Sequence, residues 1–254
     1  AGFDPNNIVQ YGCMIENLTW QLEVWCLSNG SGFYNEDGTK VIINDPAAIE
    51  AIQKIADLHL VHHVAPLSAG LTDDGVQRSL IAGTCAMTTN GAWNVGTCLA
   101  SARAEGLNYG VGVLPYMKEK VTICTGGPNV VFSQSKHPEE AMEWIKWYMK
   151  EENSWDLIES GIWMPVLESW YTDETLTRKW VENPNFPAYD EYKSAVVDYA
   201  KDYCTSTSWY YVNNTVDFNS ILGSLLGDVW TGATTAEKAI NDGLNALINA
   251  YKGE

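Results

Sequence analysis

The sequence lacks a long apolar run and a surplus of positive charge. No apolar stretch approaches the roughly 20 residues that a helix needs to span a bilayer. Lysine and arginine total 15 against 32 aspartates and glutamates, which gives a formal charge of −17. A surface of that sign repels phosphate backbones, so the sequence argues against nucleic acid as a partner.

Recurring metal-ligand spacings are missing as well. His59, His62 and His63 lie close together, but at the predicted end of a helix, where imidazole groups satisfy terminal carbonyls. The six cysteines include no Cys-x-x-Cys pair. We expect mostly buried thiols, with at most one or two disulfide bonds if the chain is exported. The sequence therefore predicts no metal site and no cofactor.

Tryptophan and tyrosine are abundant, at 11 and 13 residues. A core does not need so many rings with polar edges, because each buried indole N–H or phenol must find a hydrogen-bond partner. Their flat faces suit the C–H faces of sugar rings, whose hydroxyls can reach neighbouring amides and carboxylates. Ordinary packing accounts for most of these rings, and we expect the remainder at a binding site.

Local sequence signals predict a chain rich in helices. The expected helices end at Asn29, follow Trp93 to about 105, and cover 46–59, 72–82, 138–150, 172–182, 188–202, 215–230 and 235–251. The expected strands cover 8–14, 85–89, a segment ending at Pro115, 122–132 and a hairpin over 32–43. Asn44 or Asp45 caps the helix that begins at Pro46, and Thr234 with Glu237 forms a capping box for the last helix. Few strands among many helices indicate an α/β architecture.

One stretch places an aromatic ring where ligands collect in such folds. Residues 85–89 form a short strand, and Asn90-Gly91 makes a turn that presents Trp93. Gly91 permits the chain reversal, which puts the indole at the carboxyl end of a strand. Open α/β sheets bind their ligands along that edge.

Four motifs occur in an order that resembles a known family. They are Ala82-Gly-Thr-Cys-Ala-Met-Thr-Thr-Asn-Gly-Ala-Trp93, Asn108-Tyr-Gly-Val-Gly-Val-Leu-Pro115, Ser135-Lys-His-Pro-Glu-Glu-Ala-Met-Glu-Trp-Ile145 and Gly161-Ile-Trp-Met-Pro-Val166. Together they resemble the maltose-binding-protein-like extracellular solute-binding proteins of ABC sugar importers. The resemblance implies a type II periplasmic-binding-protein fold, a mixed sheet flanked by helices in each of two lobes, with the ligand between the lobes.

The resemblance also implies that most of the N-terminal lobe is lacking. It divides the chain into a first part of the C-terminal lobe (1–110), a partial N-terminal-lobe segment with hinge crossings (111–163), and the helical remainder of the C-terminal lobe (164–254). One helix with a strand or two cannot bury both faces of a sheet. We therefore expect a truncated chain, a proteolytic product, or a partner that supplies the missing N-terminal lobe.

Carried over residue by residue, the resemblance implies ring platforms at Trp93, Trp20 and Trp25. Glu16 and Asn17 would bind sugar hydroxyls from the end of the first crossing strand. The alternatives are that Trp25 is the inward face of its helix and that Glu16 is a solvated acid.

Further binding residues are implied beyond residue 120. Gly126, Gly127 and Asn129 match a glycine turn at which the backbone approaches the sugar, with a strand bulge as the alternative. Trp163 could stack from a crossing segment.

The last group of implied residues lies before and on a helix near the C-terminus. Trp209 and Tyr210 precede this helix, and Asn219 on it replaces a stacking ring that the family's best-known member carries.

The expected function is capture of a sugar, with an oligosaccharide favoured, and its delivery to an ABC importer without catalysis. The expected partners are a carbohydrate and the permease subunits, and the expected location is outside a bacterial cell, either membrane-tethered as a lipoprotein or periplasmic. Three alternatives remain open: a glycoside hydrolase with Glu16 or Asp217 in a carboxylate pair, a binder of ferric iron (through Tyr210 and Tyr211) or of another small solute, and a surface lectin without a transporter.

Overall fold

The computed structural model describes residues 4–5, 7–15, 18–66 and 78–253. The chain folds into two compact units, and each is described by itself. Unit 1 comprises Ala1–Asn90, Leu114–Cys124 and Asp202–Glu254, and unit 2 comprises Gly91–Val113 and Thr125–Lys201. Each unit is therefore built from segments that are separated in the sequence.

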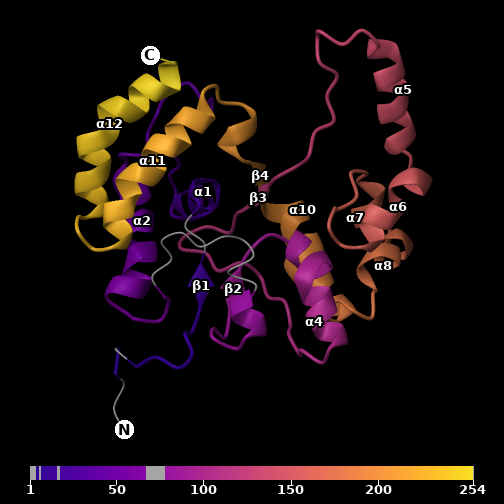
Figure 1. Cartoon of the computed structure of the whole chain (residues 1–254), viewed down its shortest axis with the longest axis horizontal. Coiled ribbons are helices and arrows are strands. Elements are labelled where there is room, and N and C mark those ends of the chain that lie inside the picture. The colour runs from indigo at the N-terminus through magenta and orange to yellow at the C-terminus, as the bar shows by residue number, and fades with distance from the viewer. Residues whose placement is uncertain (1–3, 6, 16–17, 67–77, 254) are drawn as a thin grey trace. The chain divides into compact units, whose positions relative to one another are not determined.

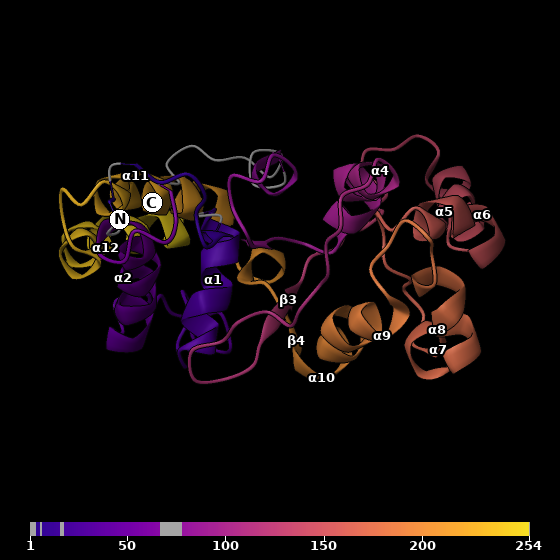
Figure 2. The same ribbon diagram turned by 90° about the horizontal axis from the view of Figure 1, so that it is seen from below.

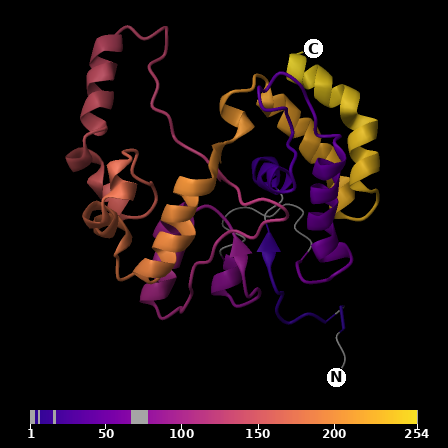
Figure 3. The ribbon, with the colours of Figure 1, turned by 180° about the vertical axis from the view of Figure 1, so that it is seen from behind.

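Unit 1 is built around four helices and one apolar core. The helices are α1 (Thr19–Ser28), α2 (Pro46–Leu60), α11 (Thr215–Trp230) and α12 (Ala236–Lys252). Helices α11 and α12 lie side by side (Figures 1 and 3), and α1 lies beside α2 (Figure 2). Leu22, Ile52, Leu226 and Leu247, one from each helix, are fully buried in the shared core. The core thus joins the first and last segments of the chain.

Capping residues explain where α2 and α12 begin. The Asp45 carboxylate accepts a hydrogen bond from the Ala47 N–H at 2.8 Å, and Pro46 occupies the first helical position. For α12 the capping residue is Thr235, whose hydroxyl accepts from the Lys238 N–H at 3.2 Å. The predicted capping box at Thr234 was therefore wrong by one residue.

The strands of unit 1 form two parallel pairs among the residues described. In the first pair, β1 (Met14–Ile15) lies beside β2 (Thr88–Thr89), and in the second, β3 (Thr122–Cys124) lies beside β4 (Cys204–Ser206). A parallel bridge between Tyr11 and Cys85 extends the first pair. The predicted hairpin is confirmed by an antiparallel bridge between Tyr34 and Val41.

Two predicted strands are corrected by the structure. Residues 108–115 form no strand, and of 122–132 only Thr122–Cys124 does. Apolar residues alternate with glycines in the first of these segments, a pattern typical of strands, but no described neighbour supplies a hydrogen-bonded ladder. Of the predicted helix 72–82, residues 78–81 are helical and 72–77 lie outside the described residues.

Unit 2 is a set of short helices around an aromatic core. Its helices are η1 (Val95–Leu99), α4 (Ala100–Ala104), α5 (Pro138–Tyr148), α6 (Glu151–Glu159), α7 (Ser169–Thr172), α8 (Glu174–Val181), α9 (Tyr189–Tyr192) and η2 (Lys193–Asp198), and α10 (Tyr199–Tyr203) runs from unit 2 into unit 1. Trp170, Trp180, Phe186 and Tyr192 are buried together. The Trp180 indole donates to the Trp170 carbonyl at 3.0 Å. Packing therefore explains several of the abundant aromatic residues.

Helix α5 is drawn in pink in Figure 1. Its apolar side chains are left uncovered by the rest of unit 2. The helix itself was predicted, but none of its residues is buried. Trp144 and Trp147 are 55% and 51% exposed, and Met142 is 44% exposed. The Trp144 and Tyr148 rings stack on each other at 5.4 Å between centroids. This uncovered face bears on the function proposed below.

The cysteines are less buried than expected. Cys26 and Cys85 are buried, Cys13 is half-buried, and Cys124 and Cys204 are exposed, all five with free thiols. Nothing is described of the Cys98 side chain. Among the described helices, none combines the length and the apolar character that a membrane crossing requires.

Candidate functional site

In unit 2 the structure brings together two of the predicted site residues, Trp163 and Gly127. A Cβ atom on Gly127 would lie 2.6 Å from Cη2 of the Trp163 ring, so the indole lies directly over the glycine backbone. Trp163 is nevertheless 46% exposed. One part of the indole is thus fixed against the backbone while the other part is open to a ligand.

Trp93 has a similar arrangement at the turn before η1. Its ring folds back onto Gly91, and any side chain at that position would overlap the indole. Trp93 is half-buried. The neighbouring Asn94 is buried, and neither its side-chain oxygen nor its side-chain nitrogen has a hydrogen-bond partner among the residues that the structure describes. A buried amide in that state is a group that a ligand or a water molecule can satisfy.

In unit 1 three consecutive aromatic residues are exposed on a short segment. Trp209, Tyr210 and Tyr211 are 44%, 47% and 51% exposed, and we call them the aromatic segment 209–211. The segment begins in the turn η3 (Ser208–Tyr210) that follows β4. Such exposed rings need an anchor if they are to keep one orientation.

The anchor is Glu23 on α1, which the sequence analysis missed. The Thr207 hydroxyl donates to the Glu23 carboxylate at 2.8 Å, and the Ser208 N–H donates to it at 3.2 Å. The same Thr207 hydroxyl accepts from the Trp209 N–H at 3.4 Å. Glu23 is only 4% exposed. A lone acid on a helix suggests a solvated side chain, and no local signal shows a partner 184 positions away.

Further contacts fix the far end of the aromatic segment. Val212 is buried in the core of unit 1. The Tyr211 ring lies against Gly38 of the hairpin turn, where a Cβ atom would be 3.0 Å from it. The aromatic segment 209–211 is therefore held at both ends, while its rings stay exposed.

The electrostatics of this anchor follow from its burial. Burial raises the pKa of Glu23, and the hydrogen bonds from Ser208 and Thr207 oppose that rise. Burial, and then the charge of Glu23, raise the pKa of Tyr211. The Tyr211 phenol is consequently protonated at neutral pH and can donate a hydrogen bond.

The other predicted residues of unit 1 have different surroundings. Trp20 is half-buried in the first turn of α1, three residues before Glu23 and so on the same helix face. Trp25 is 5% exposed within the core, so the alternative of an inward-facing ring describes it and we leave it out of the proposed site. Asn219 is half-buried on α11. Glu16 and Asn17 lie outside the described residues.

Gly126 and Asn129 of the predicted glycine turn are both exposed. A Cβ atom on Gly126 would meet nothing within 4 Å. Unlike Gly127, this position therefore does not require a glycine for packing.

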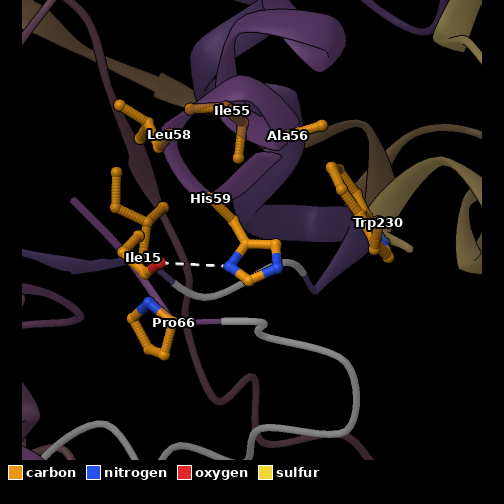
Figure 4. A pocket seen from close by; sticks show the side chains of 8 residues that line it. Ile15, Ile55, Ala56, Leu58, His59, Pro66 and Trp230 are labelled. Carbon is orange, nitrogen blue, oxygen red and sulfur yellow. Dashed lines mark hydrogen bonds between the residues drawn. The ribbon is translucent and has the colours of Figure 1, made fainter. Parts of the chain in front are cut away.

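A small pocket lies elsewhere in unit 1, at the C-terminal end of α2 (Figure 4). Its lining includes Ile15, Ile55, His59, Pro66 and Trp230, and contains none of the predicted site residues. The His59 Nδ1 atom is 3.2 Å from the Ala65 carbonyl oxygen. Because the pocket contains none of the predicted residues and is small, we do not assign it to the site.

Within the described ranges, no three histidine, cysteine, aspartate or glutamate side chains are grouped so that they could hold a metal ion.

Comparison with known proteins identifies the family. Residues 10–188 match the family model described as bacterial extracellular solute-binding protein. The chain belongs to this family. The family name implies an exported protein, and the resemblance inferred from the sequence motifs is confirmed at this level. A search of curated proteins finds no match.

Solved structures of solute-binding proteins share the fold. One is an ABC transporter solute-binding protein from Thermotoga lettingae bound with α-D-tagatose, with a TM-score of 0.75 and 15% identity over 98% of this chain. Another is an ABC substrate-binding protein from Listeria monocytogenes in complex with cycloalternan, with a TM-score of 0.72 and 19% identity over 96% of this chain. A third is UgpB from Mycobacterium tuberculosis in complex with glycerophosphocholine, with a TM-score of 0.71 and 13% identity over 97% of this chain. The predicted α/β periplasmic-binding-protein fold is thereby confirmed.

The chain is shorter than these relatives. It spans 61%, 59% and 59% of the three solved chains, respectively. The similarity thus extends over nearly all of this solute-binding chain and over only part of each relative.

Proposed function

We propose that the chain captures a carbohydrate outside the cell for an ABC importer and does not alter it chemically. The support is the family, whose role is binding, together with solved relatives in complex with tagatose and cycloalternan. We favour an oligosaccharide because one of these relatives was solved in complex with cycloalternan.

The observation that carries the proposal is the combination of exposure and fixation of the aromatic rings. Trp163 lies over Gly127, Trp93 over Gly91, and the aromatic segment 209–211 is anchored by Glu23. Rings held in place lose little conformational entropy when a ligand stacks on them. Each stacking contact contributes about 0.5–1.5 kcal/mol, and neighbouring amides such as that of Asn94 can bind hydroxyls.

The hydrolase and iron alternatives have no comparable support. A glycosidase needs two carboxyl groups facing one bond. Of the two candidate acids, Asp217 is exposed in the first turn of α11, and Glu16 lies outside the described residues. Tyr210 and Tyr211 are exposed and have no cluster of acidic or histidine ligands beside them in the described part.

Substituting the platforms tests the proposal. Trp163→Ala is expected to weaken carbohydrate binding roughly two- to tenfold, because one stacking contact is lost. Trp93→Ala is expected to have an effect of the same size. Affinities would be measured by titration calorimetry of the full chain against a panel of mono- and oligosaccharides, with the reaction mixtures analysed for cleavage.

Trp144→Ala is the matched control, since Trp144 is an exposed tryptophan of the same unit outside the proposed site. Its affinity should equal that of the unsubstituted chain. Equal losses in all three variants would contradict the assigned platforms, and cleaved sugar would contradict a purely binding role.

We also propose that a further N-terminal lobe covers α5 in the functional protein, which would be tethered at the cell surface or periplasmic and would dock on the permease. The uncovered Trp144 and Trp147 support this, as does the chain's coverage of about 60% of the solved relatives. The α5 amides are expected to exchange hydrogen more slowly once the lobe is supplied. Unchanged exchange would contradict this contact.

A further inference from the structure

The parallel pair of β3 and β4 brings two exposed cysteines together. Thr122 is the partner of Cys204 in the strand register, and Cys124 lies two residues farther along β3. Side chains two residues apart point to the same face of a sheet. Cys124 and Cys204 are therefore diagonal neighbours on one face, and both are solvent-exposed.

We propose that Cys124 and Cys204 form a disulfide bond in the exported protein. Extracellular compartments are oxidising and allow such bonds to persist. Diagonal neighbours stand somewhat farther apart than directly opposed residues. Here Cys124 is the last residue of β3 and Cys204 the first of β4, so both lie at strand ends, where a small backbone shift can bring the sulfurs into bonding range.

The two thiols already influence each other in the reduced protein. Desolvation of the thiol, and then the charge of Cys124 and a hydrogen bond with it, raise the pKa of Cys204 to about 12. Cys204 is thus almost entirely protonated at neutral pH, and bond formation should accelerate as the pH rises.

A second cysteine pair in unit 1 provides an internal comparison. Tyr11 is bridged to Cys85, and Cys13 lies two residues beyond Tyr11, so Cys13 and Cys85 have the same diagonal relation. Cys85, however, is only 2% exposed and packs with Met14. Glutathione can react at the half-buried Cys13, but the buried Cys85 must then attack the mixed disulfide. This pair is therefore expected to stay reduced under conditions that link Cys124 to Cys204.

The chemistry balances with a small disulfide, such as oxidised glutathione, as the oxidant. One cysteine thiolate attacks a glutathione sulfur, forming a mixed disulfide and releasing one glutathione thiolate. The second cysteine thiolate attacks the protein sulfur of that mixed disulfide and releases the other glutathione. The protein loses two electrons and two protons, and two glutathione thiols are formed.

The bond would constrain a part of the chain that matters for the site. Cys124 is the last residue of the middle segment of unit 1, and unit 2 occupies 125–201 before the chain returns at Asp202. A bond to Cys204 closes a loop around this whole segment. It also fixes β4 immediately before Thr207, which anchors the aromatic segment 209–211.

The test compares the reduced full chain with the chain incubated with oxidised glutathione at mildly alkaline pH. Titration of the denatured protein with a thiol reagent should show a fall from six thiols to four. Non-reducing peptide mapping should show a peptide pair joined through Cys124 and Cys204. The melting temperature should rise by roughly 5–10 °C, because the closed loop is long.

Cys124→Ser and Cys204→Ser are both expected to abolish the linked peptide and the rise in melting temperature, while Cys13→Ser leaves both unchanged. The two serine variants alter exposed positions, so they should fold. The proposal would be overturned if, after oxidation, Cys124 and Cys204 were both recovered in alkylated form. It would also be overturned if they were linked to other cysteines. Because mapping uses the unsubstituted chain, the outcome does not depend on the variants or on sugar binding.

Discussion

Replacing Phe218 with alanine is expected to lower the free energy of unfolding by roughly 3–5 kcal/mol. The Phe218 side chain on α11 is fully buried, with its ring centroid 4.9 Å from that of Tyr34 and 6.1 Å from that of Phe33. Truncation would leave a cavity where α11 meets the hairpin, and the surrounding structure relaxes only partially into such a cavity. Urea unfolding followed by circular dichroism measures the change.

Val216→Ala is the matched control for this substitution. Val216 lies two residues earlier on the same helix and is 66% exposed. Its truncation should change the unfolding free energy by less than about 0.5 kcal/mol. If Phe218→Ala lowered the free energy of unfolding no more than Val216→Ala does, Phe218 would not be packed between α11 and the hairpin as described.

Glu23→Ala is expected to destabilise the chain by roughly 2–4 kcal/mol and also to weaken carbohydrate binding. The substitution leaves the Thr207 hydroxyl and the Ser208 N–H without their buried acceptor. The aromatic segment 209–211 then loses one of its two attachments. Unfolding curves and calorimetric titration on the same samples separate the two effects, and unchanged affinity would contradict the positioning role.

Glu23→Gln distinguishes the carboxylate's charge from its hydrogen bonds. The folded pKa of Glu23 is raised above its ordinary value of 4.5, so the folded chain retains a proton that the unfolded chain has released. The stability that this provides is complete below the ordinary pKa and is lost as the pH rises through the folded pKa. Glutamine does not ionise.

The stability of the unsubstituted chain relative to Glu23→Gln should therefore fall as the pH rises from about 4 and level off above the folded pKa. Unfolding measurements on both proteins across that range give the curve. A difference that grew with pH would mean that Glu23 is stabilised as the charged form, contrary to its burial.

The elements that the sequence predicted well are those specified by adjacent residues. Asp45 and Pro46 begin α2, and apolar residues at helical spacing give α11 the bounds that the structure shows. The hairpin over 32–43 was likewise predicted. In the structure its turn is stabilised by the Asn35 side-chain oxygen, which accepts from the N–H groups of Thr39 and Lys40. The family motifs predicted the fold, which the solved relatives confirm.

What the sequence did not reveal depends on distant partners. Glu23 acts through Thr207, and no local pattern distinguishes such an acid from a solvated one. The residues adjacent to Trp25 and Trp163 do not show that the two side chains have different surroundings. Trp25 is buried in the core of unit 1, whereas the exposed Trp163 ring lies over Gly127. The strand predicted up to Pro115 failed for the same reason, since an alternating pattern does not show whether a pairing strand exists.

The division of unit 1 into three chain segments has a consequence for biosynthesis. Its core contains Leu22 from α1 and Leu247 from α12, so it cannot close before α12 has been synthesised. Export channels through which a polypeptide passes in extended form accept only chains that have not yet folded. A unit whose core waits for α12 therefore remains incompletely folded, and suited to such export, while the segments before α12 are being synthesised.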